Sequence, residues 1–254
     1  MSDEVLTQAT DGVLLITLNR PKARNAVNLA LAKALAAAVD ELEAVSELRV
    51  AILAGAGGTF CSGMDLKAFV SGETPLIPGR GFGGFTEHVP VKPVIGAVEG
   101  YALAGGLELA LACDLLIAAE DAKFGIPEVK RGLAAAAGGL VRLPRQIPSR
   151  IAMELALTGD FISAPRAAEL GLINQVVPSG AALDAARQLA AKIAANGPLA
   201  VAASKQVVAR QADWSMDEMF RRQDEIVSPI FSSEDAIEGA TAFAEKRPPN
   251  WKGR

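Results

Sequence analysis

Histidine, cysteine and tyrosine are scarce in this sequence. Its 254 residues include one histidine, two cysteines and one tyrosine. A Ser-His-Asp triad would therefore depend entirely on His88, which lies in a stretch rich in glycine and proline. Zinc sites are built from several cysteine and histidine ligands, so we expect no metal site. Acid–base chemistry must come mainly from Asp, Glu, Lys or the single Tyr101.

Excess positive charge and long apolar runs are missing as well. The chain has 25 Lys and Arg against 29 Asp and Glu, a formal net charge of −4, which predicts no general affinity for nucleic acid. No run approaches the roughly 18 apolar residues of a membrane span, and the first residues do not resemble a signal peptide, so we expect no membrane association. Cys61 and Cys113 cannot form a disulfide framework, which favours a reducing, cytoplasmic location.

What the sequence does contain is an alternation of short apolar runs and helical patterns. Strands are expected within 12–21, 49–55, 92–100 and 114–120, and a helix over 28–45 follows an Asn N-cap. Alternating strands and helices are typical of an α/β fold with a largely parallel sheet. No complete dinucleotide-binding or P-loop motif accompanies them, so a nucleotide cofactor is not indicated.

Beyond about residue 149 helical patterns dominate, and residues 198–254 contain helical patterns only. We therefore expect a core over 1–197 and a C-terminal helical region over 198–254. Amphipathic helices of this kind often bury one face in a partner subunit. The stretch 71–90 contains five glycines and three prolines and is predicted to be a mobile surface loop.

Two glycine-containing turns, within 57–67 and 99–108, each follow an expected strand and lead toward a helix. Helix N-termini carry backbone N–H groups without partners and a partial positive charge. If the two turns converge, one oxygen could be held between two N–H donors, as in an oxyanion hole. The alternative is a pair of ordinary tight turns with close packing, and the sequence leaves both open.

Two glutamates are candidates for acid–base chemistry. Glu108 lies three residues after the doublet Gly105–Gly106 in an otherwise apolar helical pattern, where a carboxylate would be buried and its pKa raised. Glu128 stands beside Lys130 and Arg131, so a surface ion pair is the simpler interpretation for it alone. Facing one substrate, the two would suit water addition to a double bond.

Five stretches together resemble the crotonase (enoyl-CoA hydratase/isomerase) superfamily over nearly the whole chain. They are "LNRPKARNAVN", "FCSGMDLK", "KPVIGAVEGYALAGGLELALACDLLIAAEDAKFGIPEVKRGL", "LTGDFISAPRAAELGLINQVV" and "EDAIEGATAFAEKRPP". The resemblance implies a spiral of ββα turns, a C-terminal helical region used in trimerisation, and commonly a dimer of trimers. It also implies an enolate of an acyl-CoA thioester, held by two backbone N–H groups.

The resemblance assigns roles to individual residues. The oxyanion donors fall on Met64 and Gly105, and Glu108 and Glu128 match the two catalytic glutamates of the family's hydratases. Coenzyme A enters as part of the substrate, so no separate cofactor is implied. Residues that match the substrate and CoA site are Lys22, Ala23, Arg24, Ser62, Met64, Asp65, Leu66 and Lys67, with Phe243 and Lys246, often from a neighbouring subunit.

Having both glutamates favours an enoyl-CoA hydratase, a hydro-lyase of fatty acid metabolism. Where related hydratases often carry Pro-Gly, this chain has Ala135–Ala136, so weaker or redirected hydration stays open. The loop "GRGFGGFTE" and the C-terminal tail are similar to those of crotonobetainyl-CoA hydratases, which leaves that substrate as an alternative. Two further alternatives for the function are double-bond isomerisation and acyl-CoA binding without catalysis.

Overall fold

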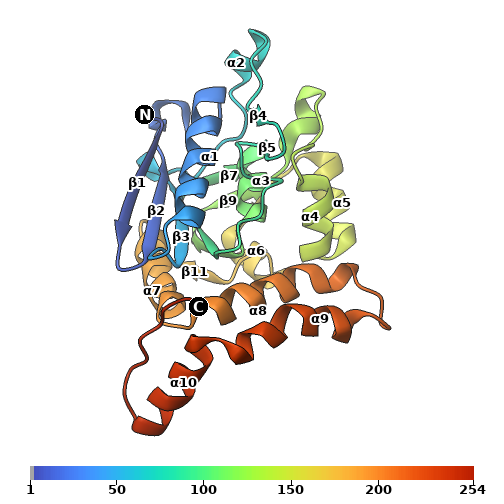
Figure 1. Cartoon of the computed structure of the whole chain (residues 1–254). Coiled ribbons are helices and arrows are strands. Elements are labelled where there is room, and N and C mark those ends of the chain that lie inside the picture. The colour runs from blue at the N-terminus through green and yellow to red at the C-terminus, as the bar shows by residue number, and fades with distance from the viewer. Residues whose placement is uncertain (1–2) are drawn as a thin grey trace.

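A computed structural model describes residues 3–254 of the chain, and a six-stranded sheet forms its centre (Figure 1). The first two strands, β1 and β2, form an antiparallel hairpin, and the rest of the sheet is parallel. In spatial order the strands are β1 (Val5–Thr10), β2 (Val13–Leu18), β3 (Val50–Gly55), β6 (Val94–Val98), β8 (Leu115–Ala119) and β11 (Gln175–Val177). The expected parallel α/β sheet is confirmed, whereas β1 was not predicted because its mostly exposed residues form no apolar run.

Short strands leave the central sheet and pair in a second one. β7 follows directly after β6, and β9 follows β8, so each turn of the chain contributes one strand to each sheet. This repetition produces the spiral of ββα turns. The second sheet contains β10 (Ile162–Ser163), β9 (Lys123–Gly125) and β7 (Tyr101–Leu103), and a separate pair is formed by β4 (Leu76–Ile77) and β5 (Gly81–Phe82).

Helices cover both faces of the central sheet. Alternate residues of β3 point to opposite sides: Ile52 belongs to the apolar cluster under α7, and Leu53 belongs to the larger cluster that contains α1 and α3. The helices of this part are α1 (Leu29–Ala44), α2 (Leu66–Val70), α3 (Gly105–Ala112), α4 (Gly139–Gln146), α5 (Ser149–Thr158), α6 (Ala164–Glu169) and α7 (Ala182–Ala194), with 3₁₀ turns η1 (Pro21–Ala23), η2 (Ala56–Gly58) and η3 (Pro127–Arg131).

The C-terminal helices lie together at one end of the molecule, orange to red in Figure 1. They are α8 (Pro198–Arg210), α9 (Met219–Val227) and α10 (Glu234–Glu245), with 3₁₀ turns η4 (Gln211–Asp213) and η5 (Ser228–Ser232). On α8, the Lys205 Nζ donates to Asp114 Oδ2 at 2.7 Å, which ties the helix to the start of β8. Within the described residues, no helix has the length and apolarity needed to cross a bilayer.

The segment 71–90 lies at the surface over most of residues 71–80, as its glycines and prolines predicted, but residues 81–86 are buried. It folds back as the β4–β5 hairpin and buries Phe82, Phe85 and Thr86 against the core. Five glycines in this segment have positive φ, which allows a compact path that no other residue type follows without strain. Glycine and proline content marked the turns correctly but could not show where the aromatic rings pack.

Candidate active site

The two glycine-containing turns meet at the start of α3. Cys61 pairs with Ala102 of β7, and the Cys61 N–H donates to the Tyr101 oxygen at 2.8 Å. Two residues on, a Cβ placed on Gly63 would lie 3.2 Å from the Gly105 nitrogen, so the turn carrying Met64 rests on the helix N-terminus. Neither the Met64 nor the Gly105 N–H donates to another group within residues 3–254. The structure thus brings together the two predicted donors.

Close packing also requires glycine at both positions of the doublet Gly105–Gly106. A Cβ on Gly105 would lie 2.4 Å from the Phe82 ring, and one on Gly106 would lie 2.1 Å from the Cys61 oxygen. Ala104, the residue before α3, has φ 54° and ψ −130°. Such a conformation costs on the order of 1–3 kcal/mol for a residue other than glycine and is typical of sharp strand-to-helix turns at functional sites.

Glu108 is buried, as its apolar neighbours predicted, with only 3% of its surface exposed. Its Oε1 accepts hydrogen bonds from the Ala137 N–H at 2.7 Å and the Gly139 N–H at 2.9 Å. Burial raises the pKa of this carboxyl, while the two amides and the charge of Arg142 oppose that rise. The loop before α4 therefore holds one oxygen of Glu108, and Oε2 is the atom left for chemistry.

Glu128 is half-buried in η3, and its environment differs from the surface ion pair that its basic neighbours indicated. Lys130 instead pairs with Asp160 at 2.7 Å. Within the described residues, the buried Glu128 Oε2 has no hydrogen-bond partner. Burial, with a smaller contribution from the negative charge of Glu108, raises the pKa of Glu128 to about 7. The two carboxyl groups are therefore close enough to interact and differ in how they are held.

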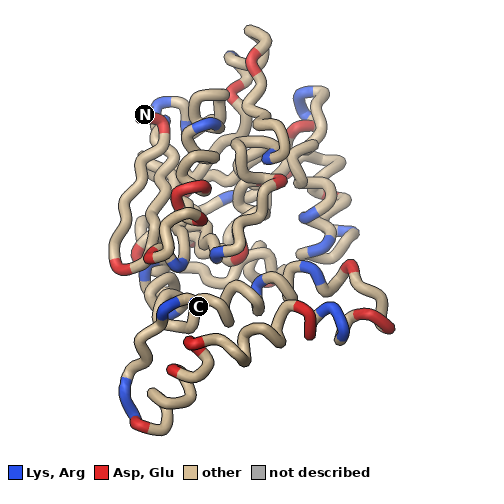
Figure 2. Tube along the Cα trace, viewed as in Figure 1, with Lys and Arg blue, Asp and Glu red and all other residues tan. Residues whose placement is uncertain are grey.

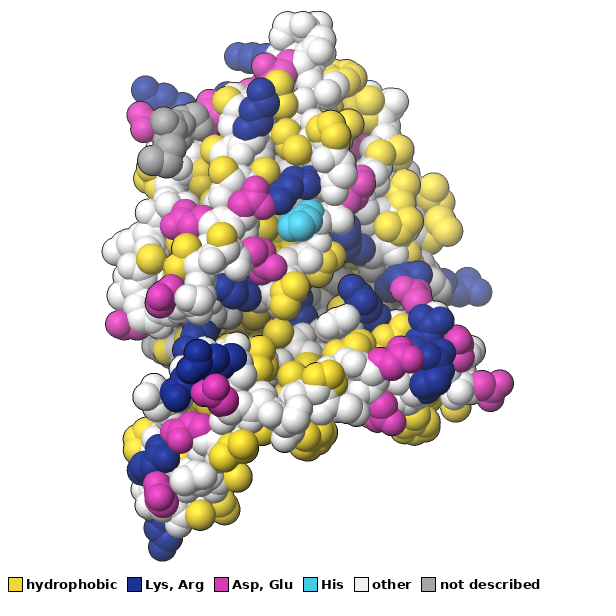
Figure 3. All heavy atoms as spheres, viewed as in Figure 1, with side chains coloured by type: hydrophobic (Ala, Val, Ile, Leu, Met, Phe, Trp, Pro, Cys, Tyr) yellow, Lys and Arg dark blue, Asp and Glu magenta, His cyan; other side chains and the backbone are white. Residues whose placement is uncertain are grey.

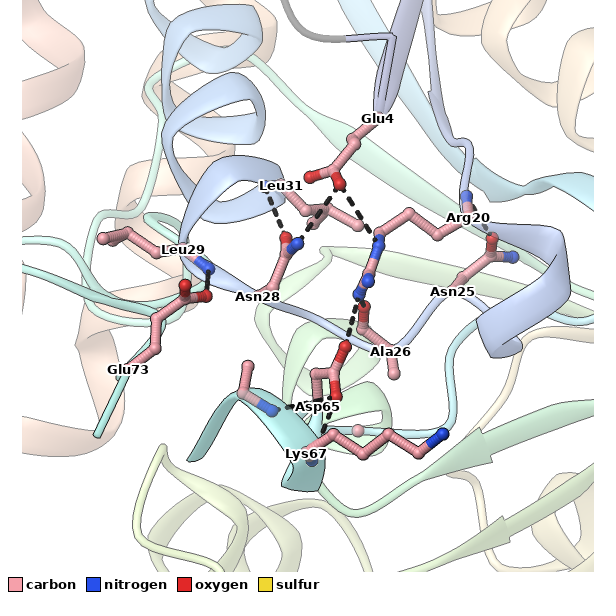
Figure 4. A network of polar contacts seen from close by, with 12 residues as sticks. Glu4, Arg20, Asn25, Ala26, Asn28, Leu29, Leu31, Asp65, Lys67 and Glu73 are labelled. Carbon is pink, nitrogen blue, oxygen red and sulfur yellow. Dashed lines mark hydrogen bonds and ion pairs between the residues drawn. The ribbon is translucent and has the colours of Figure 1, made fainter. Parts of the chain in front are cut away.

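An ionic network fixes the segment that carries Met64 (Figure 4). Arg20 Nη1 lies 3.0 Å from Asp65 Oδ2, and Arg20 Nε lies 3.3 Å from Glu4 Oε1. The other Asp65 oxygen caps α2 by accepting from the N–H groups of Lys67 and Ala68. Hydrogen bonds from Arg20 and the α2 backbone lower the pKa of Asp65 despite partial burial, so this cap is charged at neutral pH.

Most of the residues matched to the CoA site lie in two segments, 22–24 and 62–67, next to this network. Lys22 and Ala23 lie in η1, and the Ser62 N–H donates to the Arg24 oxygen at 3.0 Å. Arg24 itself has a left-handed backbone, and its guanidinium lies 6.0 Å from the Tyr101 ring centroid. Leu66 and Lys67 are exposed on the first turn of α2. One chain thus assembles the residues from Lys22 to Lys67.

Phe243 and Lys246 do not join that surface within one chain. They belong to the C-terminal end of α10, which lies at the opposite end of the molecule from α2 (Figure 1). Phe243 is 88% exposed, and Lys246 ends the helix in a left-handed conformation with φ 56°. A CoA contact from either residue requires a neighbouring copy of the chain.

Several residues that shape the site were not singled out in the sequence. Asn25 is fully buried: its side chain accepts from the Arg20 N–H and donates to the Thr59 oxygen at 2.6 Å. Arg142, on α4, donates to the Thr86 oxygen. Asn25 and Arg20 stand in the quoted stretch "LNRPKARNAVN", where polar residues next to an apolar strand offered a signal, whereas Arg142 has no sequence signal without the fold.

The described part of the chain holds no group of three or more His, Cys, Asp or Glu side chains able to surround an ion. Acidic and basic residues are scattered over the trace in Figure 2, and no basic stripe is seen in this view.

Comparison with known proteins agrees with this geometry. The family described as enoyl-CoA hydratase/isomerase matches residues 8–254. A carnitinyl-CoA dehydratase of Salmonella paratyphi A is 43% identical, with both chains covered completely. The crystal structure of an enoyl-CoA hydratase from Mycobacterium tuberculosis H37Rv is 60% identical with a TM-score of 0.98, and that of a carnitinyl-CoA hydratase from Mycobacterium avium is 45% identical with a TM-score of 0.79, each over the whole of both chains. The chain belongs to the enoyl-CoA hydratase/isomerase family.

Proposed function

We propose that this protein is an enoyl-CoA hydratase, which adds water reversibly across the 2,3-double bond of an enoyl-CoA thioester. The observation that carries the proposal is the pair Glu108 and Glu128, two interacting carboxyl groups next to the free N–H groups of Met64 and Gly105. Membership of the family supports the same reaction class.

The two amides serve the thioester oxygen. When water adds to C3, negative charge moves through C2 to that oxygen and forms an enolate. Two N–H groups fixed by the Cys61–Ala102 pairing and by the start of α3 need no reorganisation to meet this charge. Removing one such donor typically costs about 2.7–4 kcal/mol of transition-state stabilisation.

The two glutamates divide the proton transfers. Glu108, whose Oε1 is held by two amides, takes a proton from the attacking water through Oε2. Glu128, whose pKa is about 7, carries a proton near neutral pH and gives it to C2. The hydroxyl then bonds C3, the new hydrogen bonds C2, and solvent restores both carboxyl groups. No cofactor beyond the CoA portion of the substrate takes part.

The CoA portion of the substrate binds across η1 and the start of α2 in this proposal. Lys22 and Lys67 are exposed cations there, and the hydrogen bond from the Ser62 N–H to the Arg24 oxygen, next to Ala23, joins the two segments. Asp65 stays engaged with Arg20 and acts by holding the segment. This places the CoA on the α2 side of the thioester and the acyl group on the α4 side.

Assembly of three chains would complete the CoA site. We assign residues 198–254 to oligomerisation because they expose large apolar side chains, many of which gather over α8–α10 in Figure 3. These include Val208, Met216, Phe220, Phe231, Ile237 and Phe243. A trimer, or a dimer of trimers, would bring Phe243 and Lys246 of one copy to the CoA of another.

The two free cysteines, both buried, suit the reducing cytoplasm.

For the acyl group, a simple enoyl chain is favoured over crotonobetaine. The identity is 60% to the M. tuberculosis enoyl-CoA hydratase and 45% to the M. avium carnitinyl-CoA hydratase. Crotonobetainyl-CoA remains the second candidate because of the relatives that bear the carnitinyl name.

The test follows loss of the conjugated enoyl thioester absorbance with crotonyl-CoA and with crotonobetainyl-CoA. Glu108→Gln should lower turnover by two or more orders of magnitude while acyl-CoA binding persists. Glu154→Gln, an exposed change on α5, is the matched control and should leave turnover unaltered. Unchanged turnover in Glu108→Gln would contradict the assignment.

The product separates hydration from the remaining alternatives. A 3-hydroxyacyl-CoA supports the proposal, whereas a shifted alkene formed from a 3-enoyl-CoA identifies an isomerase. Tight CoA-ester binding with no turnover of any enoyl-CoA identifies a binding protein. Comparison of Ala136→Gly with the natural chain shows how far Ala136 limits hydration.

A further inference from the structure

Two segments on opposite sides of the candidate site converge on one arginine. The first is residues 81–87, whose Phe82 ring packs directly over Gly105. The Phe82 N–H donates to Thr86 Oγ1 at 3.0 Å, and Thr86 is fully buried. Any shift of the 81–87 segment therefore reaches the start of α3, where the Gly105 N–H lies.

The second segment is the loop 136–139, which leads into α4. It supplies the two N–H groups, from Ala137 and Gly139, that hold Glu108 Oε1. Gly138, between them, has φ 113° and begins α4 as its N-cap. A displacement of this loop would release the Glu108 carboxylate.

Arg142 joins the two segments. Its Nη2 donates to the Thr86 oxygen at 2.5 Å, and its backbone N–H donates to the Gly138 oxygen at 2.8 Å. A Cβ on Gly138 would lie 2.2 Å from Arg142 Nη1, so the guanidinium passes directly over that glycine. A side chain at residue 138 would exclude this path, which adds to the reason for glycine there.

Charged groups from three elements face this guanidinium. Glu108 on α3 and Glu87 beside Thr86 are negative and favour its charged form, while its burial opposes it. Arg145, one turn along α4, pairs with Asp213 at 3.2 Å and lines the same 390 Å³ cavity as Glu87 and Arg142. Beyond Glu108 lie Glu128 and Arg131, which act on each other. Arg142 is thus the positive group that interacts with Glu108.

We propose that Arg142 is a positioning residue that ties the 81–87 segment to the 136–139 loop and thereby fixes Gly105 and Glu108 relative to each other. It acts through Thr86 and Gly138 and needs no contact with the substrate. This inference rests on the proposed function for its kinetic consequences, but its structural part stands by itself. Its positive charge also opposes the rise in the pKa of Glu108 that burial causes, which favours the carboxylate form that accepts a proton from water.

The experiment compares Arg142→Gln with the control Arg145→Gln, an exposed arginine on the same helix. Arg142→Gln should lower kcat for crotonyl-CoA by at least tenfold, with KM changed less than threefold. The acid limb of its pH–rate profile should move to higher pH, because the pKa of Glu108 rises when the nearby positive charge is lost. Amide hydrogen exchange at Ala137 and Gly139 should become at least tenfold faster. Arg145→Gln should change none of these.

Arg142→Lys separates the effect of the positive charge from that of the hydrogen bond to the Thr86 oxygen, and it replaces Arg142→Gln in the test if that variant does not fold. It keeps the positive charge but not the guanidinium that reaches Thr86, so the acid limb should stay in place while kcat falls at least fivefold. The proposal would be overturned if the kcat of Arg142→Gln equalled that of the natural chain or if the acid limb of its pH–rate profile did not move. Unchanged hydrogen exchange at the Ala137 and Gly139 amides in Arg142→Gln would also overturn it. If the natural chain hydrates no enoyl-CoA, the function fails, while the exchange measurement still decides the role of Arg142.

Discussion

Replacement of Gly106 by alanine tests whether the packing of the two turns controls catalysis. The new Cβ would lie 2.1 Å from the Cys61 oxygen and 2.7 Å from its carbonyl carbon, whereas real Cβ contacts essentially never fall below 3.0 Å. Both neighbours are backbone atoms, so no side chain can rotate away. The Cys61 carbonyl must therefore move, together with the hydrogen bond that it accepts from the Leu103 N–H at 3.0 Å.

The expected loss of kcat in Gly106→Ala follows from the short distance between the new Cβ and the Cys61 oxygen. Cys61 must shift by roughly 1 Å, and a misplacement of about 1 Å at a reacting geometry can lower the rate about 100-fold. Met64 lies three residues further on the same segment, so its N–H moves with the shift. Overpacking of this kind also destabilises a fold by about 1–3 kcal/mol.

The assay measures kcat with crotonyl-CoA at a temperature where urea titration shows the variant to be folded. Affinity for butyryl-CoA, which cannot be hydrated, reports separately on CoA binding and should change little. Gly197→Ala is the matched control, because its Cβ would meet the Trp251 ring at an ordinary 3.6 Å. A folded Gly106→Ala protein whose kcat stays within twofold of the natural chain would refute the argument.

Four further outcomes are expected. Activity should fall as pH rises through about 7, because Glu128 must hold its proton to give it to C2, and Glu128→Gln should remove that limb together with most of the activity. Because the pKa of Glu128 is raised, the folded state binds more protons than the unfolded state between about pH 4.5 and pH 7. The free energy of unfolding therefore falls as pH rises through that window. In urea titrations at pH 5 and pH 8, Glu128→Gln should gain stability relative to the natural chain at pH 8. Asp65→Ala should lower the free energy of unfolding by about 1 kcal/mol, because the α2 cap is lost. It should also raise KM for acyl-CoA more than it lowers kcat, since Asp65 holds the segment through Arg20. A larger effect on kcat than on KM would place Asp65 nearer the reacting atoms. Ile237→Glu, on the exposed face of α10, should shift the species seen by light scattering from trimer to monomer, and an unchanged mass would remove α10 from the interface.

Glu108 and Gly105 were candidates from the sequence itself because each breaks a local pattern, whereas Glu128 and Met64 were assigned by the family resemblance. Glu108 interrupts an apolar helical run, and the glycine doublet before it is costly in a helix. Both signals arise from neighbours within a few residues. The strands β2, β3, β6 and β8 and the helix α1 were predicted for the same reason, since a buried face is repeated at a fixed spacing.

Tertiary structure decided what local pattern could not. Gly106 is glycine because Cys61, 45 residues earlier, places a carbonyl against it, and residues 81–86 are buried where Phe82 packs on Gly105. Arg142 has an ordinary place on an amphipathic helix until the fold brings Thr86 to its guanidinium. The raised pKa of Glu128 likewise depends on burial by distant segments and on the charge of Glu108, neither of which is encoded by its neighbours Lys130 and Arg131. Such properties come from contacts between residues far apart in the chain, and only the folded arrangement determines them.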